Sequence, residues 1–235
     1  MQFKRVVVTG IGALTPLGNT AQSYWDALAA GKSGAAPITR FDTEKYKTKF
    51  ACEVKDFDVK DYIDRKESRK MDPFTQYAMV VADEAVQDSG IHEAGLAPEE
   101  VGVIWGSGIG GLKSLEKEMK DYALGDGTPR FNPFFIPKMI TDIAPGFISI
   151  KYGFRGPNFA TVSACASSNN AIVDSFNYIR LGMATAIVTG GSEACVTESA
   201  IGGFNSMKAL SERNDSPETA SRPFDKDRDG FVLGE

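Results

Sequence analysis

The chain has 235 residues, of which 42% are apolar and 24% charged, and its net charge is -5 at pH 7. This composition is typical of a globular protein with one large core or two smaller ones, and it excludes collagen-like, coiled-coil and disordered chains. The excess of acidic residues argues against a general nucleic-acid binder. No apolar run approaches the about 20 residues that a membrane span needs, so we expect no membrane partner either.

The three cysteines, Cys52, Cys165 and Cys195, are odd in number and widely spaced. This is the pattern of neither a disulfide framework nor a zinc site, so we expect free thiols in a reducing compartment. Residues 1–10 contain too short an apolar run for a signal peptide. The sequence therefore predicts a soluble, cytoplasmic protein.

Short β-branched runs alternate with longer helical patterns along the chain. Four runs predict buried strands, namely Arg5–Thr9, Val101–Trp105, Asn158–Val162 and Ala186–Thr189. Helices are predicted over Pro73–Asp88, with Asp72 as its cap, and over Ser167–Leu181. This order predicts an α/β sheet covered by helices on both faces.

Two long loops, Gly31–Lys60 and Asp121–Pro137, interrupt this pattern. Loops of this length in a compact domain are usually functional or lie at an interface. The sequence shows no repeat and no linker that would mark an independent second domain.

The segment Gly106–Gly111 matches the G-x-G-x-x-G dinucleotide fingerprint and follows a predicted strand. That fingerprint also needs an acidic residue at the end of the next strand, about 20 residues further on. Asp126 has this spacing but lies in a Gly-Asp-Gly turn. The pattern therefore favours a glycine turn that lets the backbone approach a neighbouring group closely.

The segment Asp225–Gly230 imitates the first half of a calcium-binding EF-hand loop. Such a loop ends in a bidentate glutamate at position 12, whereas Glu235 stands at position 11. We therefore expect a charged, solvated turn that precedes a strand.

The segment Thr161–Ser168 carries the strongest signal for chemistry. A β-branched strand runs into a turn of small residues, and a helix begins directly after it, with Cys165 in the turn. Unpaired N–H groups at a helix amino terminus favour a thiolate and can donate to an oxyanion. Most cysteines are buried structural thiols, which is how Cys52 and Cys195 are interpreted. From these residues alone, both roles stay open for Cys165.

The sequence resembles the β-ketoacyl-acyl-carrier-protein synthases, and most closely the elongating type, synthase II. The resemblance spans the whole chain. It rests on segments that occur in the family's order: VVVTGIGALTPLG, RKMDPFTQYAM, GSGIGG, GPNFATVSACASSNNAI, IVTGGSEA and ALSERNDSPETASRPFDKDRDGFVLGE.

The resemblance implies a thiolase-like α/β fold made of two similar halves, each with a five-stranded mixed sheet covered by helices. Residues 1–235 would form the amino-terminal half, with the second half outside this chain. It also implies a homodimer whose interface lies near the nucleophile, and an apolar arm at Asn132–Pro137 that meets the partner subunit.

The resemblance also implies the roles of individual residues. Cys165 matches the acyl-accepting cysteine, and its own backbone N–H would be one oxyanion donor. Ile109 and Phe204 match positions that line the acyl pocket.

A basic patch is implied at Lys66, Arg69 and Lys70, which share one face if Arg65–Lys70 is helical. Such a run is most often only a solvated face. In the family it docks the acidic acyl carrier protein, and Lys208 matches a further docking position.

The implied reaction is acyl transfer to Cys165, followed by decarboxylative condensation with malonyl-carrier protein in fatty acid elongation. No metal or organic cofactor is implied, because phosphopantetheine arrives on the carrier protein. The family also uses two histidines and a supporting lysine.

The only histidine here, His92, matches no catalytic position and is predicted in an exposed loop; the catalytic histidines are expected in the second half. Two alternatives stay open: a non-catalytic fragment or interaction subunit, and a cysteine acyltransferase of the same fold that never condenses.

Overall fold

The computed structural model describes residues 3–235, which divide into two compact units. Unit 1 comprises the amino-terminal segment up to Gly12 together with Asp58–Glu193. Unit 2 comprises Ala13–Phe57 and Ala194–Glu235. Each unit is built from two separate stretches of sequence, which explains why no single linker marks the division.

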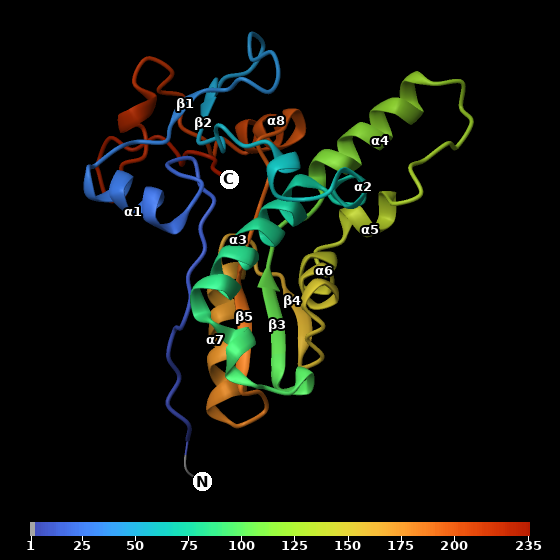
Figure 1. Ribbon diagram of the computed structural model, residues 1–235. Coiled ribbons are helices and arrows are strands. Elements are labelled where there is room, and N and C mark those ends of the chain that lie inside the picture. Colours follow the sequence, from blue (N-terminus) through green and yellow to red (C-terminus); the bar gives the residue numbers. More distant parts are fainter. Residues whose placement is uncertain (1–2) are drawn as a thin grey trace. The chain divides into compact units, whose positions relative to one another are not determined.

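Unit 1 contains a parallel sheet in which β3 (Val101–Gly106) lies between β4 (Asn158–Thr161) and β5 (Ala186–Gly191) (Figure 1). Both Val103 and Ile104 are fully buried. Successive side chains of a strand point to opposite faces, so both faces of β3 are covered. This burial explains why its sequence is continuously apolar instead of alternating.

Helices cover this sheet. The α-helices of unit 1 are α2 (Arg65–Ser68), α3 (Pro73–Ser89), α4 (Leu112–Leu124), α5 (Phe135–Met139), α6 (Ile143–Tyr152) and α7 (Ser167–Arg180). Its 3-10 helices are η1 (Val59–Asp61), η2 (Ile91–Ala94) and η3 (Pro98–Glu100). Helix α7 packs on β3 and β5, whereas α6 packs on β3 and β4 and contacts α3. The two long helices predicted from the sequence, α3 and α7, are therefore confirmed.

The predicted cap of α3 is also confirmed. The carboxylate of Asp72 accepts hydrogen bonds from the backbone N–H of Phe74 at 3.3 Å and of Ser114 at 2.9 Å. Asp72 is fully buried, and this burial raises its pKa, although the hydrogen bonds from Ser114 and Phe74 oppose the shift. Asp72 thus ties the beginning of α3 to the first turn of α4.

The predicted strand at Arg5–Thr9 is wrong, and the predicted five-stranded mixed sheet of this half is not confirmed. Among residues 3–235, the sheet of unit 1 has three strands, all parallel. Val7 and Val8 are 58% and 80% exposed. Lys4 N–H donates to the Arg180 carbonyl at 3.1 Å, but no ladder follows. β-Branched residues favour extended backbone, yet a strand forms only where a neighbouring edge pairs with it.

Unit 2 consists of α1 (Ala21–Ala29), an antiparallel pair of β1 (Ala36–Pro37) and β2 (Phe50–Ala51), α8 (Glu198–Ser206) and the 3-10 helix η4 (Pro217–Thr219). Its main apolar core contains Ile38, Ala51, Val196, Ile201 and Leu210. The predicted loop at 31–60 therefore contains a short hairpin-like pair that contributes to this core.

The charged turn predicted at 225–230 is present, but residues 231–235 form only isolated bridges where the prediction placed a strand. The Asp229 carboxylate accepts hydrogen bonds from the Ser211 hydroxyl at 2.8 Å and the Glu212 N–H at 2.9 Å. Phe231 then pairs with Leu210 in an isolated parallel bridge. Asp229 is thus engaged by its own chain in a position that an EF-hand would give to calcium.

Within the described part of the chain, no helix combines the length and apolarity that crossing a membrane requires.

Candidate active site

Cys165 lies in the turn between β4 and α7, with its side chain exposed. The preceding residue, Ala164, has a φ of 51°, in the left-handed region that residues other than glycine rarely adopt. Such strained backbone persists only where surrounding contacts hold it, and it occurs preferentially at functional sites. The predicted sharp strand-to-helix turn is therefore present.

Ser167, the first residue of α7, holds this turn in shape. Its hydroxyl accepts from the Ser163 N–H at 2.9 Å and donates to the Ala164 carbonyl at 2.7 Å. Its own carbonyl accepts from the Thr161 hydroxyl at 2.8 Å. Ser167 is 3% exposed, so these bonds are shielded from water. Hydrogen bonds from Ser167 to residues on the strand side of Cys165 thus hold the turn that presents the cysteine.

Helix α7 begins two residues after Cys165. Its N-cap residue, Ala166, has no side chain that can accept from the first turn. No side chain therefore caps the positive end of this 14-residue helix beside the cysteine, although the Ser167 N–H donates to the Ala164 carbonyl at 3.1 Å. A helix end of this kind stabilises a thiolate and donates to negative charge that develops on a carbonyl oxygen.

Glycines let α7 approach the sheet closely at this point. A Cβ atom added to Gly106, at the end of β3, would lie 2.4 Å from the carbonyl carbon of Ser167. One added to Gly191, at the end of β5, would lie 2.0 Å from the Ser168 hydroxyl oxygen. Only glycine fits at either position, which confirms the predicted close approach of backbone.

The glycine turn after β3 encloses a carboxylate, that of Glu193. Three backbone N–H groups donate to it: Gly108 at 2.7 Å, Ile109 at 3.0 Å and Gly110 at 3.2 Å. The Ser107 hydroxyl donates at 3.2 Å. Successive N–H groups that converge in this way form an anion-binding nest. In this chain the anion is supplied by the protein itself, in the position where a dinucleotide fingerprint would hold phosphate.

The glycine turn and the nucleophile turn lie against each other. A Cβ on Gly108 would be 3.1 Å from the carbonyl oxygen of Ala164, the neighbour of Cys165. Ile109, at the tip of the glycine turn, is 45% exposed. The structure therefore brings the turn of Ile109 beside that of Cys165, and Glu193 holds the shape of the glycine turn.

The sequence interpretation missed Glu193, although a signal was present. Glu193 follows the glycine pair that ends β5, and Gly108 follows the end of β3. The carboxyl ends of parallel strands meet at one edge of a sheet. An acidic residue after one strand and a glycine turn after its neighbour therefore lie within reach of each other.

The other two cysteines fit their predicted structural role. Cys52 is partly buried, and this burial raises the pKa of its thiol, opposed by the nearby Lys55. Cys195 is 1% exposed. Neither thiol lies at the start of a helix.

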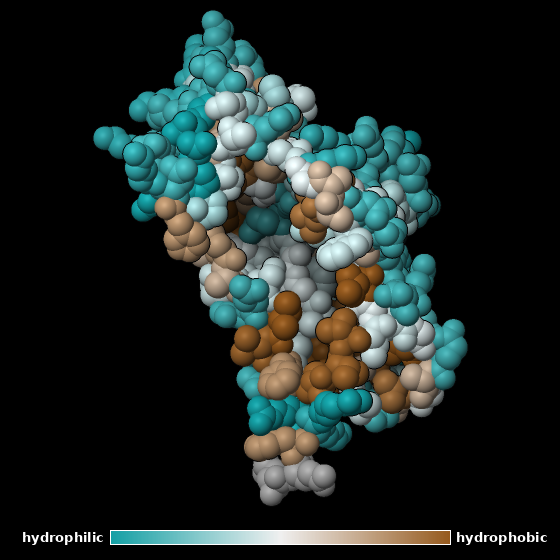
Figure 2. Space-filling view, turned by 90° about the vertical axis from the view of Figure 1, so that its left-hand side faces the viewer, coloured by the Kyte–Doolittle hydropathy of each residue, from teal (hydrophilic) through white to brown (hydrophobic). Residues whose placement is uncertain are grey.

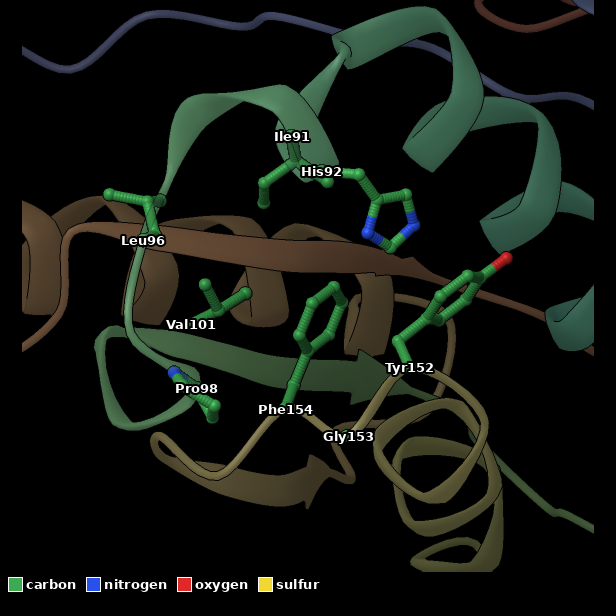
Figure 3. Close-up of a pocket in the computed structure, with 8 residues that line it drawn as sticks. All are labelled: Ile91, His92, Leu96, Pro98, Val101, Tyr152, Gly153 and Phe154. Atoms are coloured by element: carbon green, nitrogen blue, oxygen red, sulfur yellow. The ribbon is translucent and has the colours of Figure 1, made fainter.

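His92 lies in η2 and is exposed, as predicted for it. Its ring centroid is 5.5 Å from that of Tyr152 and 6.4 Å from that of Phe154. These three rings line a hollow of about 120 Å³ that also includes Val101, the first residue of β3 (Figure 3). His92 is thus at the amino edge of the sheet, whereas Cys165 follows the carboxyl end of β4. It is not placed to assist the cysteine.

The predicted docking residues occupy both units. Lys66 lies in α2, which ends at Ser68, so Arg69 caps that helix and Lys70 follows it. The helix is shorter than the span Arg65–Lys70, over which the three basic residues were predicted to share one face. Lys66 and Arg69 are exposed, and the ammonium group of Lys70 is 2.7 Å from the carboxylate of Glu67.

Phe204 and Lys208 belong to unit 2. Phe204, in α8, packs on the core of that unit, with its ring centroid 5.3 Å from that of Phe231. Lys208 follows α8 and is exposed. Within residues 3–235, no group of three or more His, Cys, Asp and Glu side chains is arranged to hold a metal ion.

The chain is similar in sequence to proteins of one family. Residues 3–235 match the family described as Beta-ketoacyl synthase, N-terminal domain. The chain is 49% identical over 235 residues to the 3-oxoacyl-[acyl-carrier-protein] synthase 2 of Synechocystis sp., covering 100% of this chain and 56% of that protein. It is 48% identical over 234 residues to the Staphylococcus aureus protein of the same name, again covering 56% of it. The chain thus spans about half the length of these curated relatives.

Solved structures show the same fold. A Beta-ketoacyl synthase from Burkholderia phymatum has a TM-score of 0.85 and 29% identity, covering 97% of this chain and 56% of that one. The ishigamide ketosynthase/chain length factor has a TM-score of 0.87 and 30% identity, covering 98% and 56%. These likenesses confirm the thiolase-like α/β class predicted from the sequence, although not its strand count.

We predict that Cys165 is the first thiol to be alkylated in the folded protein. It is exposed at a helix end, whereas burial disfavours the thiolate of Cys52 and shields Cys195. Peptide mapping after brief iodoacetamide treatment should show Cys165 modified at least about tenfold faster than Cys52, with Cys195 modified only after unfolding. Faster labelling of either other cysteine contradicts the assignment of the nucleophile.

Replacing Glu193 should loosen the glycine turn. The substitution Glu193→Ala leaves the N–H groups of Gly108 and Ile109 without their acceptor, whereas the Gly110 N–H keeps the Ser107 hydroxyl at 3.1 Å. We expect this loss to cost about 2 kcal/mol of unfolding free energy. Glu193→Gln keeps one carbonyl oxygen and should cost less. Thermal unfolding measures the cost, and hydrogen exchange should show faster exchange at Gly108 and Ile109 in the alanine variant. Unchanged exchange at these two residues means that Glu193 does not hold the turn.

Proposed function

Because the chain belongs to the β-ketoacyl synthase family, we propose that it is the amino-terminal, nucleophile-bearing half of a 3-oxoacyl-[acyl-carrier-protein] synthase. The observation that carries the proposal is the exposed Cys165 on a turn that Ser167 holds, at the amino end of α7. An exposed thiol at a helix end is suited to accept an acyl group.

The first step is acyl transfer. The Cys165 sulfur attacks the thioester carbonyl of an acyl chain borne on phosphopantetheine of the carrier protein. The N–H groups at the start of α7, with the backbone N–H of Cys165, stabilise the oxyanion of the tetrahedral intermediate. That intermediate collapses, the phosphopantetheine thiolate leaves and takes up a proton, and the acyl group stays on Cys165 as a thioester.

The second step is condensation. A malonyl thioester on the carrier protein loses carbon dioxide and leaves an enolate. The enolate carbon attacks the Cys165 thioester, a carbon–carbon bond forms, and the cysteine thiolate is released with a β-ketoacyl-carrier protein as product. The reaction needs no metal or organic cofactor beyond the phosphopantetheine of the substrates.

Donors for the enolate come from outside this chain in our proposal. His92 is the only histidine, and it lies at the opposite edge of the sheet from Cys165. We therefore assign the two catalytic histidines and the supporting lysine to the second half of the condensing enzyme. Ile109 and Phe204 are assigned to the acyl pocket.

Exposed apolar side chains on α7 support the proposal that this helix contacts a partner surface outside this chain. Ile172, Val173 and Phe176 are 52%, 54% and 41% exposed, while the buried face of this helix carries the small residues Ala171 and Ser175. Figure 2 shows apolar residues gathered on the side of the molecule where α7 lies in Figure 1. Exposed apolar faces of this kind usually lie at interfaces. We assign this one to contact with the second half and with the other subunit of a homodimer.

The arm at 132–137 is assigned to the same dimer. Phe134 and Ile136 are 40% and 56% exposed, so this segment offers apolar side chains to a partner. The segment that leads into it is stiffened by Phe131, whose ring stacks on that of Phe135 at 5.5 Å. We assign the protein to the cytoplasm, where its thiols stay reduced.

The proposed reaction is tested with the full-length gene product and with residues 1–235. The full-length protein should condense acyl- and malonyl-carrier protein, and Cys165→Ala should lower the rate by at least about 10³-fold, whereas Cys52→Ala leaves it unchanged. Residues 1–235 alone should not condense, although mass spectrometry of this chain should still detect slow acylation of Cys165.

The outcomes separate the alternatives. Acylation without condensation in the full-length protein indicates a cysteine acyltransferase of the same fold. If the full-length protein shows neither acylation nor condensation, it is an interaction subunit. Full condensation by residues 1–235 alone refutes the assignment of the histidines to a second half.

The patch at Lys66, Arg69 and Lys70 should bind the carrier protein by charge. Reversing all three to glutamate should weaken binding about tenfold at low salt and much less at 0.5 M salt, since salt screens surface attraction. Calorimetry measures both affinities. A control with glutamate at Lys4, Lys32 and Arg155 makes the same change in net charge elsewhere. Equal losses in the two triple variants mean that the patch is only a solvated face.

A further inference from the structure

The peptide bond between Ala164 and Cys165 carries two polar groups that point to opposite sides. A trans peptide holds its carbonyl and its N–H antiparallel in one plane, and no peptide bond among residues 3–235 is cis. The direction of the Ala164 carbonyl therefore sets the direction of the Cys165 N–H. The contacts of the carbonyl thus decide which side of the turn receives the N–H.

The Ala164 carbonyl is held on the inner side of the turn. It accepts from the Ser167 hydroxyl at 2.7 Å and from the Ser167 N–H at 3.1 Å. Its oxygen also faces the glycine turn, since a Cβ on Gly108 would lie 3.1 Å from it. Ser167 is 3% exposed. The carbonyl therefore points into the protein, toward the start of α7.

The Cys165 N–H consequently points away from Ser167, toward the outside of the turn. Cys165 is exposed, and no acceptor within residues 3–235 takes up its N–H. An N–H without a protein partner is tolerated on an exposed residue, because water accepts from it. This donor is thus available to a substrate oxygen, beside the sulfur of the same residue.

The Ser167 hydroxyl opposes the rotation that would undo this arrangement. Ala164 has a φ of 51°, a conformation that is unfavourable for a residue with a Cβ. The hydroxyl spans Ala164, since it also accepts from the Ser163 N–H at 2.9 Å. Without it, the Ser163 N–H loses its acceptor and the Ala164 carbonyl keeps only the Ser167 N–H. A rotation of the peptide that relaxes Ala164 and turns the Cys165 N–H inward is then less strongly opposed.

The direction of this N–H matters for one kind of reaction. When a thiolate attacks a thioester, the electron pair of the carbonyl moves to its oxygen, and a fixed donor stabilises the resulting oxyanion. In acyl transfer the backbone N–H of the nucleophile itself is well placed for this role. A donor that points elsewhere gives no such stabilisation.

We propose that Ser167 is a positioning residue for acyl transfer, because its hydroxyl holds the Ala164 carbonyl inward and thereby directs the Cys165 N–H at the oxyanion. This inference rests on the function proposed above. It separates two roles of the turn, namely presenting the thiol and orienting the donor. Alkylation by iodoacetamide needs only the first, since a carbon–sulfur bond forms, iodide leaves and no oxyanion develops.

The test compares these two reactions of Cys165 in the full-length protein and in its variant Ser167→Ala. Acylation by acyl-carrier protein, followed by mass spectrometry, should be at least about tenfold slower in the variant, since a misdirected donor loses part of the about 10²–10³-fold that a whole donor supplies. Alkylation should change by less than about threefold, because the helix end still favours the thiolate. Ser167→Thr keeps the hydroxyl and should restore acylation to within about threefold.

Ser175→Ala is the matched control. Ser175 lies on the same helix and is also 3% exposed, and its hydroxyl donates to the Ala171 carbonyl at 2.7 Å. The substitution thus removes a buried hydroxyl and its hydrogen bond without touching the turn. Both rates should stay within about twofold of those of the unmodified protein. An equal loss of acylation in Ser167→Ala and Ser175→Ala overturns the inference.

Hydrogen exchange tests the orientation without any substitution, so it does not depend on the folding of a variant. In the unmodified full-length protein the Cys165 amide should exchange as fast as exposed amides without a partner, because nothing in the turn accepts from it. Protection of this amide overturns the outward orientation of the N–H.

The remaining outcomes distinguish the inference from the function on which it rests. If the unmodified protein is alkylated at Cys165 but never acylated, the proposed function fails, and the inference with it. If it is acylated, but acylation and alkylation fall together in Ser167→Ala, the hydroxyl supports the turn as a whole and only the inference fails. Unchanged acylation in Ser167→Ala overturns the inference as well.

Discussion

The parallel pairing of β3 with β4 and β5 is the constraint on which the candidate active site depends. Parallel strands end at the same edge of their sheet, so the three segments that follow them must lie together. One of these segments carries Cys165, the second is the glycine turn with Ile109, and the third carries Glu193. Chemistry at the carboxyl ends of parallel strands is a general feature of α/β folds, since the loops there are free to vary while the sheet stays rigid.

Close approach of backbone shapes this edge. Gly106 and Gly191 admit the start of α7 against the sheet, and the buried hydroxyl of Ser167 then fixes the turn that carries Cys165. Glu193 supplies the acceptor for the N–H groups of Gly108 and Ile109, and it shares the Gly110 N–H with the Ser107 hydroxyl. The cysteine is thus exposed while every segment around it is held by hydrogen bonds, as pre-organised catalysis requires.

In unit 2 the functional candidates are brought together by polar side chains that join distant segments, and not by the pairing of strands. Asn205 and Thr48 tie the loop at 45–49 to the end of α8, and three lysines, Lys45, Lys47 and Lys208, gather as a result. Taken singly, each lysine is an ordinary surface residue. Their proximity is what creates an electrostatic feature, and long-range charge of this kind acts on association more than on the stability of the fold.

The sequence by itself determined the helices α3 and α7, the three paired strands and the nucleophile turn, because each is encoded by local periodicity, capping residues and small side chains. The motifs of the family determined the roles expected for Cys165 and its neighbours. Only the tertiary structure decided that Arg5–Thr9 stays unpaired, that Glu193 fills the glycine turn and that Lys45 and Lys47 lie beside Lys208. Each of these depends on a partner far away in the chain, and a local pattern specifies conformation but not which distant segment will meet it.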